Sequence, residues 1–78
     1  FQSQVPGPEA MHEGARMESI VQRELAALDP DHRLLIVLRD VQGMSYQDII
    51  KITGLQEGTL KSRLHRARLA LKERLEPY

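Results

Sequence analysis

The sequence predicts an all-α fold, a small four-helix domain that contains a helix-turn-helix. Apolar residues recur at spacings of three and four along most of the chain, which is the period of an α-helix. Gly, Pro, Ser and Asp residues divide this pattern into four segments with short connections. No segment alternates apolar and polar residues as strands do. A chain of 78 residues suffices for one small domain and is too short for two.

The first helix is preceded by a segment of different composition. Residues 1–14 are rich in Pro, Gly and polar types, so we expect a flexible linker or tail there and a folded domain over residues 15–78. The helical period begins near Glu13 and stops at Asp29-Pro30. One face of this helix carries the apolar residues Met17, Ile20, Val21, Leu25 and Leu28.

The second helix has clear signals at both ends. Asp29 can cap it, and Pro30 fits the first turn, where a missing N–H costs nothing. It runs to about Val41, and Gly43 ends it because glycine accepts the left-handed conformation. We expect it to be the most buried helix, since apolar residues occupy more than one side: Leu34, Leu35, Ile36, Val37, Leu38 and Val41.

The third helix is short. Ser45 begins it, and Asp48 stands where a capping box has Glu or Gln. Gly54 ends it after barely two turns. The residues that we expect to face inward are Tyr46, Ile49 and Ile50.

The fourth helix is longer and basic. It starts near Gln56 and runs to about Glu76, because Pro77 stops it. At about 100° per residue, one stripe faces the core: Leu60, Leu64, Ala67, Leu71 and Leu75. The opposite side carries Gly58, Thr59, Ser62, His65, Arg66 and Leu69. The flanks carry Lys61, Arg63, Arg68 and Lys72.

The last two helices form the pattern of a helix-turn-helix, whose second helix enters the major groove of DNA. Arg66 can bond guanine in a bidentate manner, and Thr59 or Ser62 can reach a base edge or a phosphate. The flanking basic residues lie where the phosphate walls of the groove would be. His65 faces outward, so we expect it to stack or to contact phosphate.

The charge distribution agrees with a polyanionic partner although the net charge is zero. Residues 1–50 hold four basic and eight acidic residues, a net charge of −4, whereas residues 51–78 hold seven basic and three acidic residues, a net charge of +4. Such asymmetry predicts one face for a polyanion and another for a different partner.

Other functional classes lack support in the sequence. No nucleophile–base pair, paired carboxylates or phosphate-binding loop indicates an enzyme, a cofactor or a small-molecule substrate. His12, His32 and His65 do not have metal-ligand spacing. The absence of Cys, of a signal peptide and of a long apolar segment predicts a cytoplasmic protein that does not contact membrane.

Three stretches resemble region 4 of bacterial sigma factors, most closely the extracytoplasmic-function (ECF) group. They are Leu28–Arg33, Leu38–Ile49 and Gly58–Arg68. The last stretch, Gly-Thr-Leu-Lys-Ser-Arg-Leu-His-Arg-Ala-Arg, is the most specific, whereas the middle one is also similar to LuxR-type regulators. The resemblance covers roughly residues 18–75.

The resemblance implies recognition of the promoter −35 element within RNA polymerase holoenzyme. The implied partners are double-stranded promoter DNA, the flap of the β subunit of the polymerase core, and an anti-sigma factor. It implies these DNA-contacting positions: Thr59, Lys61, Ser62, Arg63, His65, Arg66 and Arg68. Two alternatives stay open, a helical module that binds only proteins and the DNA-binding domain of a LuxR-type regulator, which would bind palindromes as a dimer.

Several residues depart from the family or from the helical pattern. The family usually has a small residue where Ile50 stands, so we expect the larger Ile50 to widen the packing between the two helices of the motif. The family also usually has an aliphatic residue where Thr53 stands. Leu69 points away from the core stripe, so we expect it to form, with Ala70, an apolar spot for an anti-sigma factor or another sigma domain. Tyr46 is expected in the core and Tyr78 in a frayed tail.

Overall fold

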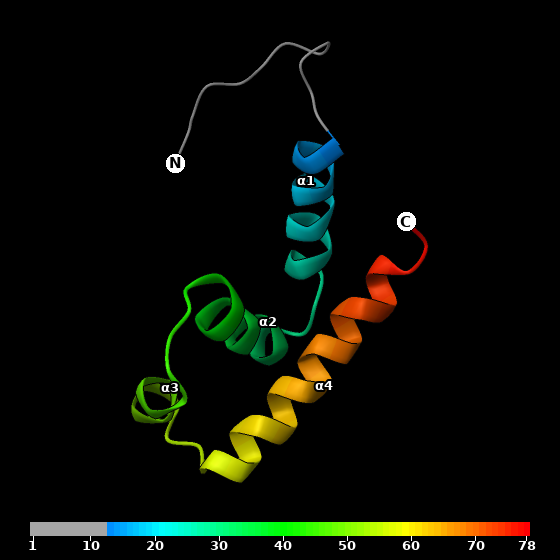
Figure 1. Ribbon diagram of the computed structural model, residues 1–78. Coiled ribbons are helices and arrows are strands. Elements are labelled where there is room, and N and C mark those ends of the chain that lie inside the picture. Colours follow the sequence, from blue (N-terminus) through cyan, green and yellow to red (C-terminus); the bar gives the residue numbers. More distant parts are fainter. Residues whose placement is uncertain (1–12) are drawn as a thin grey trace.

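The computed structural model describes residues 13–78, which form four helices joined by short turns (Figure 1). The helices are α1 (Glu13–Ala26), α2 (Pro30–Ile36), α3 (Tyr46–Thr53) and α4 (Glu57–Leu75). A π-helical turn, η2 (Val37–Val41), extends α2. No strand occurs within these residues, so the predicted all-α fold with four helices is confirmed. Most of the predicted tail lies outside the described residues.

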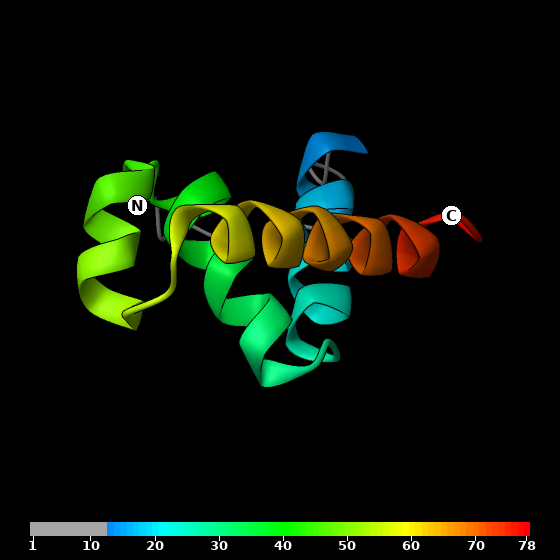
Figure 2. The same ribbon diagram turned by 90° about the horizontal axis from the view of Figure 1, so that it is seen from below.

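The longest helix, α4, organises the domain. It crosses the whole molecule in Figure 2, with α3 beside its N-terminal end and α1 toward its C-terminal half. The most extensive helix–helix packing is between α2 and α4, and α1 and α3 each pack on α4 as well. A single helix therefore carries both the second half of the helix-turn-helix and the attachment of α1.

The core lies where α2, α3 and α4 meet. Ile49, Leu60 and Leu64 are completely enclosed, with exposed fractions of 0%, 0% and 1%. The remaining core residues are Leu25, Leu28, Leu35, Ile36, Leu38 and Ala67. The predicted stripe of α4 is thus confirmed over its N-terminal half, whereas Leu71 is only partly buried because fewer elements cover that part of α4.

Three apolar residues that the helical period assigned to buried faces are exposed. Met17 is 44% exposed, because the first turns of α1 project away from the core (Figure 1). Leu34 and Val41 are 46% and 60% exposed. The segment of α2 and η2 is nevertheless the most buried of the described helices, as predicted, because Leu35, Ile36 and Leu38 are core residues and its packing on α4 is the most extensive.

The ends of α2 and η2 satisfy their backbone groups locally. The Asp29 side chain accepts a hydrogen bond from Asp31 N at 2.9 Å, as its capping role predicted. At the other end, Gln42 N donates to Val37 O at 2.9 Å, which closes the wider π turn. Gly43 then reverses the chain with φ +72°.

Candidate nucleic-acid interface

The helix-turn-helix consists of α3, the turn 54–56 and α4. Ser45 caps α3 through its Oγ, which accepts a hydrogen bond from Asp48 N at 3.1 Å. Gly54 ends α3 with φ +75°, and its N–H donates to Ile50 O at 2.7 Å. The glycine turn therefore fixes the direction in which α4 leaves α3.

Thr53 has a specific task in this turn. Its hydroxyl donates to Ile49 O at 2.8 Å and accepts from Leu55 N at 3.2 Å. Those two bonds satisfy backbone groups at the C-terminal end of α3, which an aliphatic side chain could not do. Ile50, the other departure from the family pattern, is partly buried against the core.

The seven predicted DNA-contacting residues are all exposed, while the core stripe of the same helix is enclosed. Leu60, Leu64 and Ala67 are at most 1% exposed. The exposed residues are Thr59, Lys61, Ser62, Arg63, His65, Arg66 and Arg68. Their outward placement agrees with the helical phase, whereas their role in DNA binding remains a prediction.

The first turn of α4 offers backbone donors. Gln56, the N-cap residue, makes no side-chain hydrogen bond to the helix. The N–H groups of residues 57–59 precede the first intrahelical bond, which Leu60 N donates to Gln56 O at 2.8 Å. Free donors at a helix N-terminus can bind a phosphate oxygen.

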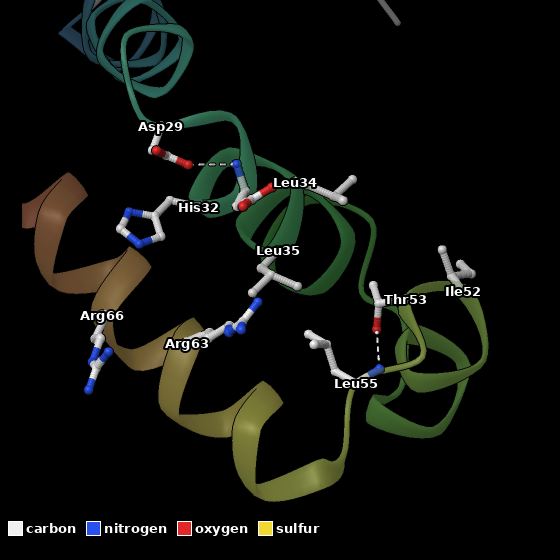
Figure 3. A pocket seen from close by; sticks show the side chains of 10 residues that line it. Asp29, His32, Leu34, Leu35, Ile52, Thr53, Leu55, Arg63 and Arg66 are labelled. Atoms are coloured by element: carbon white, nitrogen blue, oxygen red, sulfur yellow. Dashed lines mark hydrogen bonds between the residues drawn. The ribbon is translucent and has the colours of Figure 1, made fainter.

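Arg63 and Arg66 line a groove on one flank of α4 (Figure 3). Its volume is about 570 Å³, and the start of α2 and the end of α3 form its other walls. Figure 3 shows Arg63 directed across the groove toward Leu35. Neither arginine forms an ion pair within residues 13–78. Leu34 and Ile52, at 46% and 59% exposed, lie on the same groove.

Two basic residues of the other flank, Lys61 and Arg68, are paired. Lys61 Nζ lies 3.0 Å from Glu57 Oε2, one helical turn earlier. Arg68 binds Asp40 of η2 through two hydrogen bonds, Nε to Oδ2 at 2.9 Å and Nη2 to Oδ1 at 2.6 Å. The hydrogen bond from Arg68 lowers the pKa of Asp40, and its positive charge adds to this effect.

Tyr46 connects this flank to the start of α3. Its ring is partly buried against the core, as expected, but it also lies beneath two cations. The Arg39 guanidinium carbon lies 4.6 Å from the ring centroid, and Lys61 Nζ lies 5.7 Å from it. Arg39 Nη1 also donates to Met44 O at 2.7 Å. No local pattern in the sequence predicts these contacts of Arg39 and Asp40, because they join separate elements.

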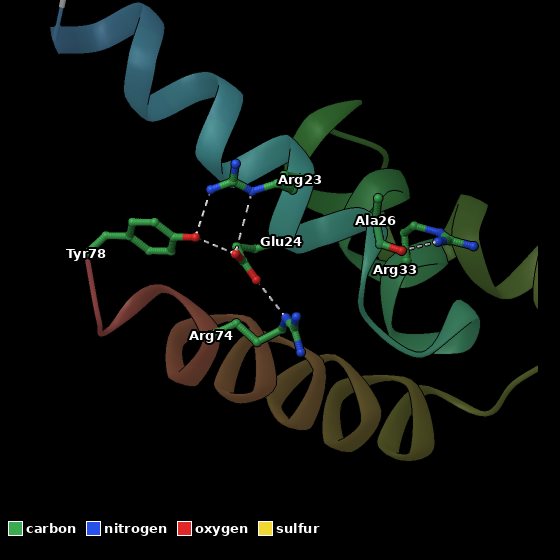
Figure 4. A network of polar contacts seen from close by, with 6 residues as sticks. All are labelled: Arg23, Glu24, Ala26, Arg33, Arg74 and Tyr78. Carbon is green, nitrogen blue, oxygen red and sulfur yellow. Dashed lines mark hydrogen bonds and ion pairs between the residues drawn. The ribbon is translucent and has the colours of Figure 1, made fainter.

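A second charged cluster lies at the other end of α4 (Figure 4). Glu24 of α1 accepts from Arg74 Nε at 2.8 Å and from the Tyr78 hydroxyl at 2.7 Å. The Tyr78 hydroxyl in turn accepts from Arg23 Nη2 at 2.8 Å. The hydrogen bonds that Glu24 accepts, from Tyr78 first and then from Arg74, lower its pKa, although burial opposes them. Tyr78 is thus bound to α1, contrary to the expectation of a frayed tail.

Two other features, a metal site and a membrane span, are absent from the part of the chain that the structure describes. The described residues contain no group of three or more His, Asp or Glu side chains that could hold a metal ion. His12 lies outside these residues. None of the helices between residues 13 and 78 is long and apolar enough to cross a bilayer.

Comparison with known proteins identifies similar sequences. Residues 18–71 match the model of a family described as "Sigma-70, region 4". The chain is 37% identical over 70 residues to the ECF RNA polymerase sigma factor SigE of Mycolicibacterium smegmatis, a match that covers 90% of this chain and 27% of that protein. It is 34% identical over 74 residues to the ECF RNA polymerase sigma-E factors of Salmonella typhimurium and Escherichia coli, a match that covers 95% of this chain and 39% of each. The chain therefore spans less than half the length of these relatives.

Proposed function

Since the chain belongs to the sigma-70 region 4 family, we propose that it recognises the −35 element of promoter DNA as part of an RNA polymerase sigma factor. In this role it binds DNA in the cytoplasm and catalyses no reaction itself. The proposal depends on the outer side of α4, where Arg63 and Arg66 are exposed and form no ion pair with any acidic residue of the described part of the chain. The match to a sigma family model favours this role over a LuxR-type regulator or a module that binds only proteins.

The geometry suggests how the docking works. The N-terminal half of α4 enters the major groove, where Arg66 bonds a guanine edge and Ser62 or Thr59 bonds a neighbouring base or phosphate. The free N–H groups of the first turn and the amino group of Lys61 meet the phosphate backbone. Gly58 has no side chain, and no other segment of the described residues packs against it, so the start of α4 presents little bulk to the groove.

The proposal is tested by fluorescence anisotropy of this chain with −35-like and scrambled duplexes at low salt. We expect the wild type to prefer a subset of sequences, and Arg66→Ala to remove that preference at a cost of about 1–3 kcal/mol for the preferred site. Arg74→Ala is the matched control, because Arg74 lies on the same helix but is bound to Glu24. Equal binding of all duplexes by the wild type would contradict the proposal.

The protein partners are part of the same proposal. We expect the polymerase core, through the flap of its β subunit, and an anti-sigma factor to bind apolar side chains that the fold leaves exposed. Leu69, 45% exposed and next to the partly buried Ala70, is the patch that the sequence predicted. Leu34 and Ile52 on the groove form a second one, and a protein bound there would cover Arg63 and Arg66 and so exclude DNA.

These two patches can be compared by single substitutions in the sigma factor that contains this chain. Leu69→Asp and Ile52→Asp each place a charge on one patch, whereas Met17→Asp places it on an exposed side chain of α1 that does not line the groove. We expect at least one of the first two to weaken binding to purified polymerase core, and Met17→Asp to leave it unchanged. Unchanged binding by all three variants would exclude both patches as the contact with the core.

A further inference from the structure

Arg68 differs from the other arginines that the sequence assigned to DNA. Both of its side-chain bonds go to one carboxylate, Asp40, in a bidentate arrangement. Such a pair fixes the orientation of both side chains more firmly than a single ion pair does. Arg63 and Arg66 have no acidic partner within the described residues. The guanidinium of Arg68 is therefore bound to a residue of the same chain, whereas those of Arg63 and Arg66 are available to a ligand.

The position of Arg68 on α4 agrees with a structural task. It follows Ala67 directly and comes four residues after Leu64, both of which are enclosed. Helical phase therefore places it at the edge of the core stripe, closer to η2 than to the outermost line of Ser62 and Leu69. Its side chain is 47% exposed and that of Asp40 is 37% exposed, so the pair lies at the surface between the two elements.

Asp40, the partner of Arg68, lies just before the connection between η2 and α3. Asp40 belongs to η2, which leads through residues 42–45 into α3. Arg39 contacts the same connection, because its Nη1 donates to Met44 O and its guanidinium stacks on Tyr46. The Asp40–Arg68 pair thus joins the middle of α4 to the segment that sets where α3 begins. Asp40, and Tyr46 to a smaller extent, raise the pKa of Arg68.

We propose that Arg68 is a positioning residue, which with Asp40 holds α4 against η2 and fixes the angle between α3 and α4 on DNA, rather than a contact to a phosphate. This inference rests on the proposed DNA recognition. It changes the role that the sequence assigned to Arg68 and adds Asp40 to the residues on which recognition depends.

The two roles predict opposite effects of Asp40→Asn. If Arg68 bound a phosphate, Asp40 would compete with that phosphate, and removing its charge would tighten DNA binding. If the pair positions α4, the same substitution releases Arg68 and weakens binding to the preferred duplex, by about fivefold, together with the preference over scrambled DNA. Asp48→Asn is the matched control, because it removes one charge from the first turn of α3 and Asp48 makes no ion pair in the described part of the chain.

A charge exchange separates the roles a second time. Arg68→Asp alone breaks the pair and weakens binding under either role. Adding Asp40→Arg rebuilds the pair in reverse, so we expect it to restore most of the sequence preference. A phosphate contact would instead stay lost, because an aspartate would then face the phosphate.

The salt dependence gives an independent measurement. A lost phosphate contact makes the log–log salt slope less steep by about 0.9, whereas a lost positioning residue leaves it unchanged. We expect Arg68→Gln to keep the wild-type slope and Arg63→Gln to lower it. All titrations are made below the melting temperature of each variant, so that unfolding does not contribute.

The outcomes separate this inference from the proposed function. Tighter binding by Asp40→Asn, no recovery in the exchanged variant, or a lower slope for Arg68→Gln would overturn the positioning role while leaving promoter recognition intact. A wild type without sequence preference would overturn both. Weaker binding by Asp40→Asn, with recovery on exchange and an unchanged slope, would establish the role.

Discussion

The two ends of α4 use the same residue type in opposite ways. At the C-terminal end, Arg74 is bonded to Glu24, whose carboxylate also binds Tyr78. At the N-terminal half, Arg63 and Arg66 have no acidic partner among residues 13–78. The first arrangement attaches α1 to α4, and the second leaves positive charge for a ligand. The arginines that the fold leaves without an acidic partner are therefore a better indicator of a DNA-binding surface than the total number of arginines.

The largest expected effect comes from the core that both ends share. Leu64 is 1% exposed, so Leu64→Ala should lower the free energy of unfolding by about 2–5 kcal/mol and abolish DNA binding through loss of the fold. Urea denaturation followed by circular dichroism measures this. Leu69→Ala, on the exposed side of the same helix, should change stability by less than about 0.5 kcal/mol. Similar losses in the two variants would show that the stripe is misassigned.

Gly54→Ala should disturb only the helix-turn-helix end. Gly54 has φ +75°, where an alanine is strained by about 1 kcal/mol. Gly14→Ala in α1 is the control, since Gly14 has no positive φ and alanine favours a helix there. In thermal melts, the melting temperature should fall for Gly54→Ala and should rise or stay the same for Gly14→Ala. A stable Gly54→Ala variant with wild-type DNA affinity would contradict the role of the turn.

The fold and the outer face of α4 could be predicted from the sequence, because both depend on local periodicity. Ser45, Gly43 and Gly54 mark helix ends through their own backbone preferences, and the phase of Leu60 and Leu64 decides which side of α4 is exposed. The resemblance to region 4 of ECF sigma factors, carried by residues 58–68, is confirmed by the family match.

The pairs between distant elements could not be predicted. Asp40 and Arg68 are 28 residues apart, and Glu24 and Arg74 are 50 apart. Their meeting depends on the angles at which helices cross, which no local pattern encodes. Tyr78 was assigned to a frayed end for the same reason, because only the tertiary structure brings it to Arg23 and Glu24.

Tyr78→Phe should affect only the C-terminal end, and weakly. The variant loses the hydroxyl that bonds Arg23 and Glu24 at an exposed site. We expect the melting temperature to fall by less than about 4 °C, with DNA affinity unchanged. An altered DNA affinity would mean that the two ends of α4 are coupled.

The smallest effect is a pH dependence at this same end. The pKa of Glu24 lies below its ordinary value of 4.5 in the folded chain, so its stabilising effect is complete above that pH and is lost as pH falls through the lowered pKa. The melting temperature of the wild type should therefore drop more steeply below pH 4.5 than that of Glu24→Gln. The lowered pKa of Asp40 contributes equally to both proteins and cancels in the difference. Parallel curves would show that the Glu24 cluster does not form in solution.

The π turn at Val37–Val41 sets the length of chain between α2 and the helix-turn-helix. Such a turn holds one residue more than an α-helical turn, and the bond from Gln42 N to Val37 O closes it. Deleting one residue here would leave a regular α-helix as the available backbone. If the residue is removed between Val37 and Asp40, the same deletion brings Asp40 one position closer to Val37 and so changes the direction of its side chain relative to Arg68. A one-residue change in this segment would therefore preserve the helix and uncouple Asp40 from Arg68.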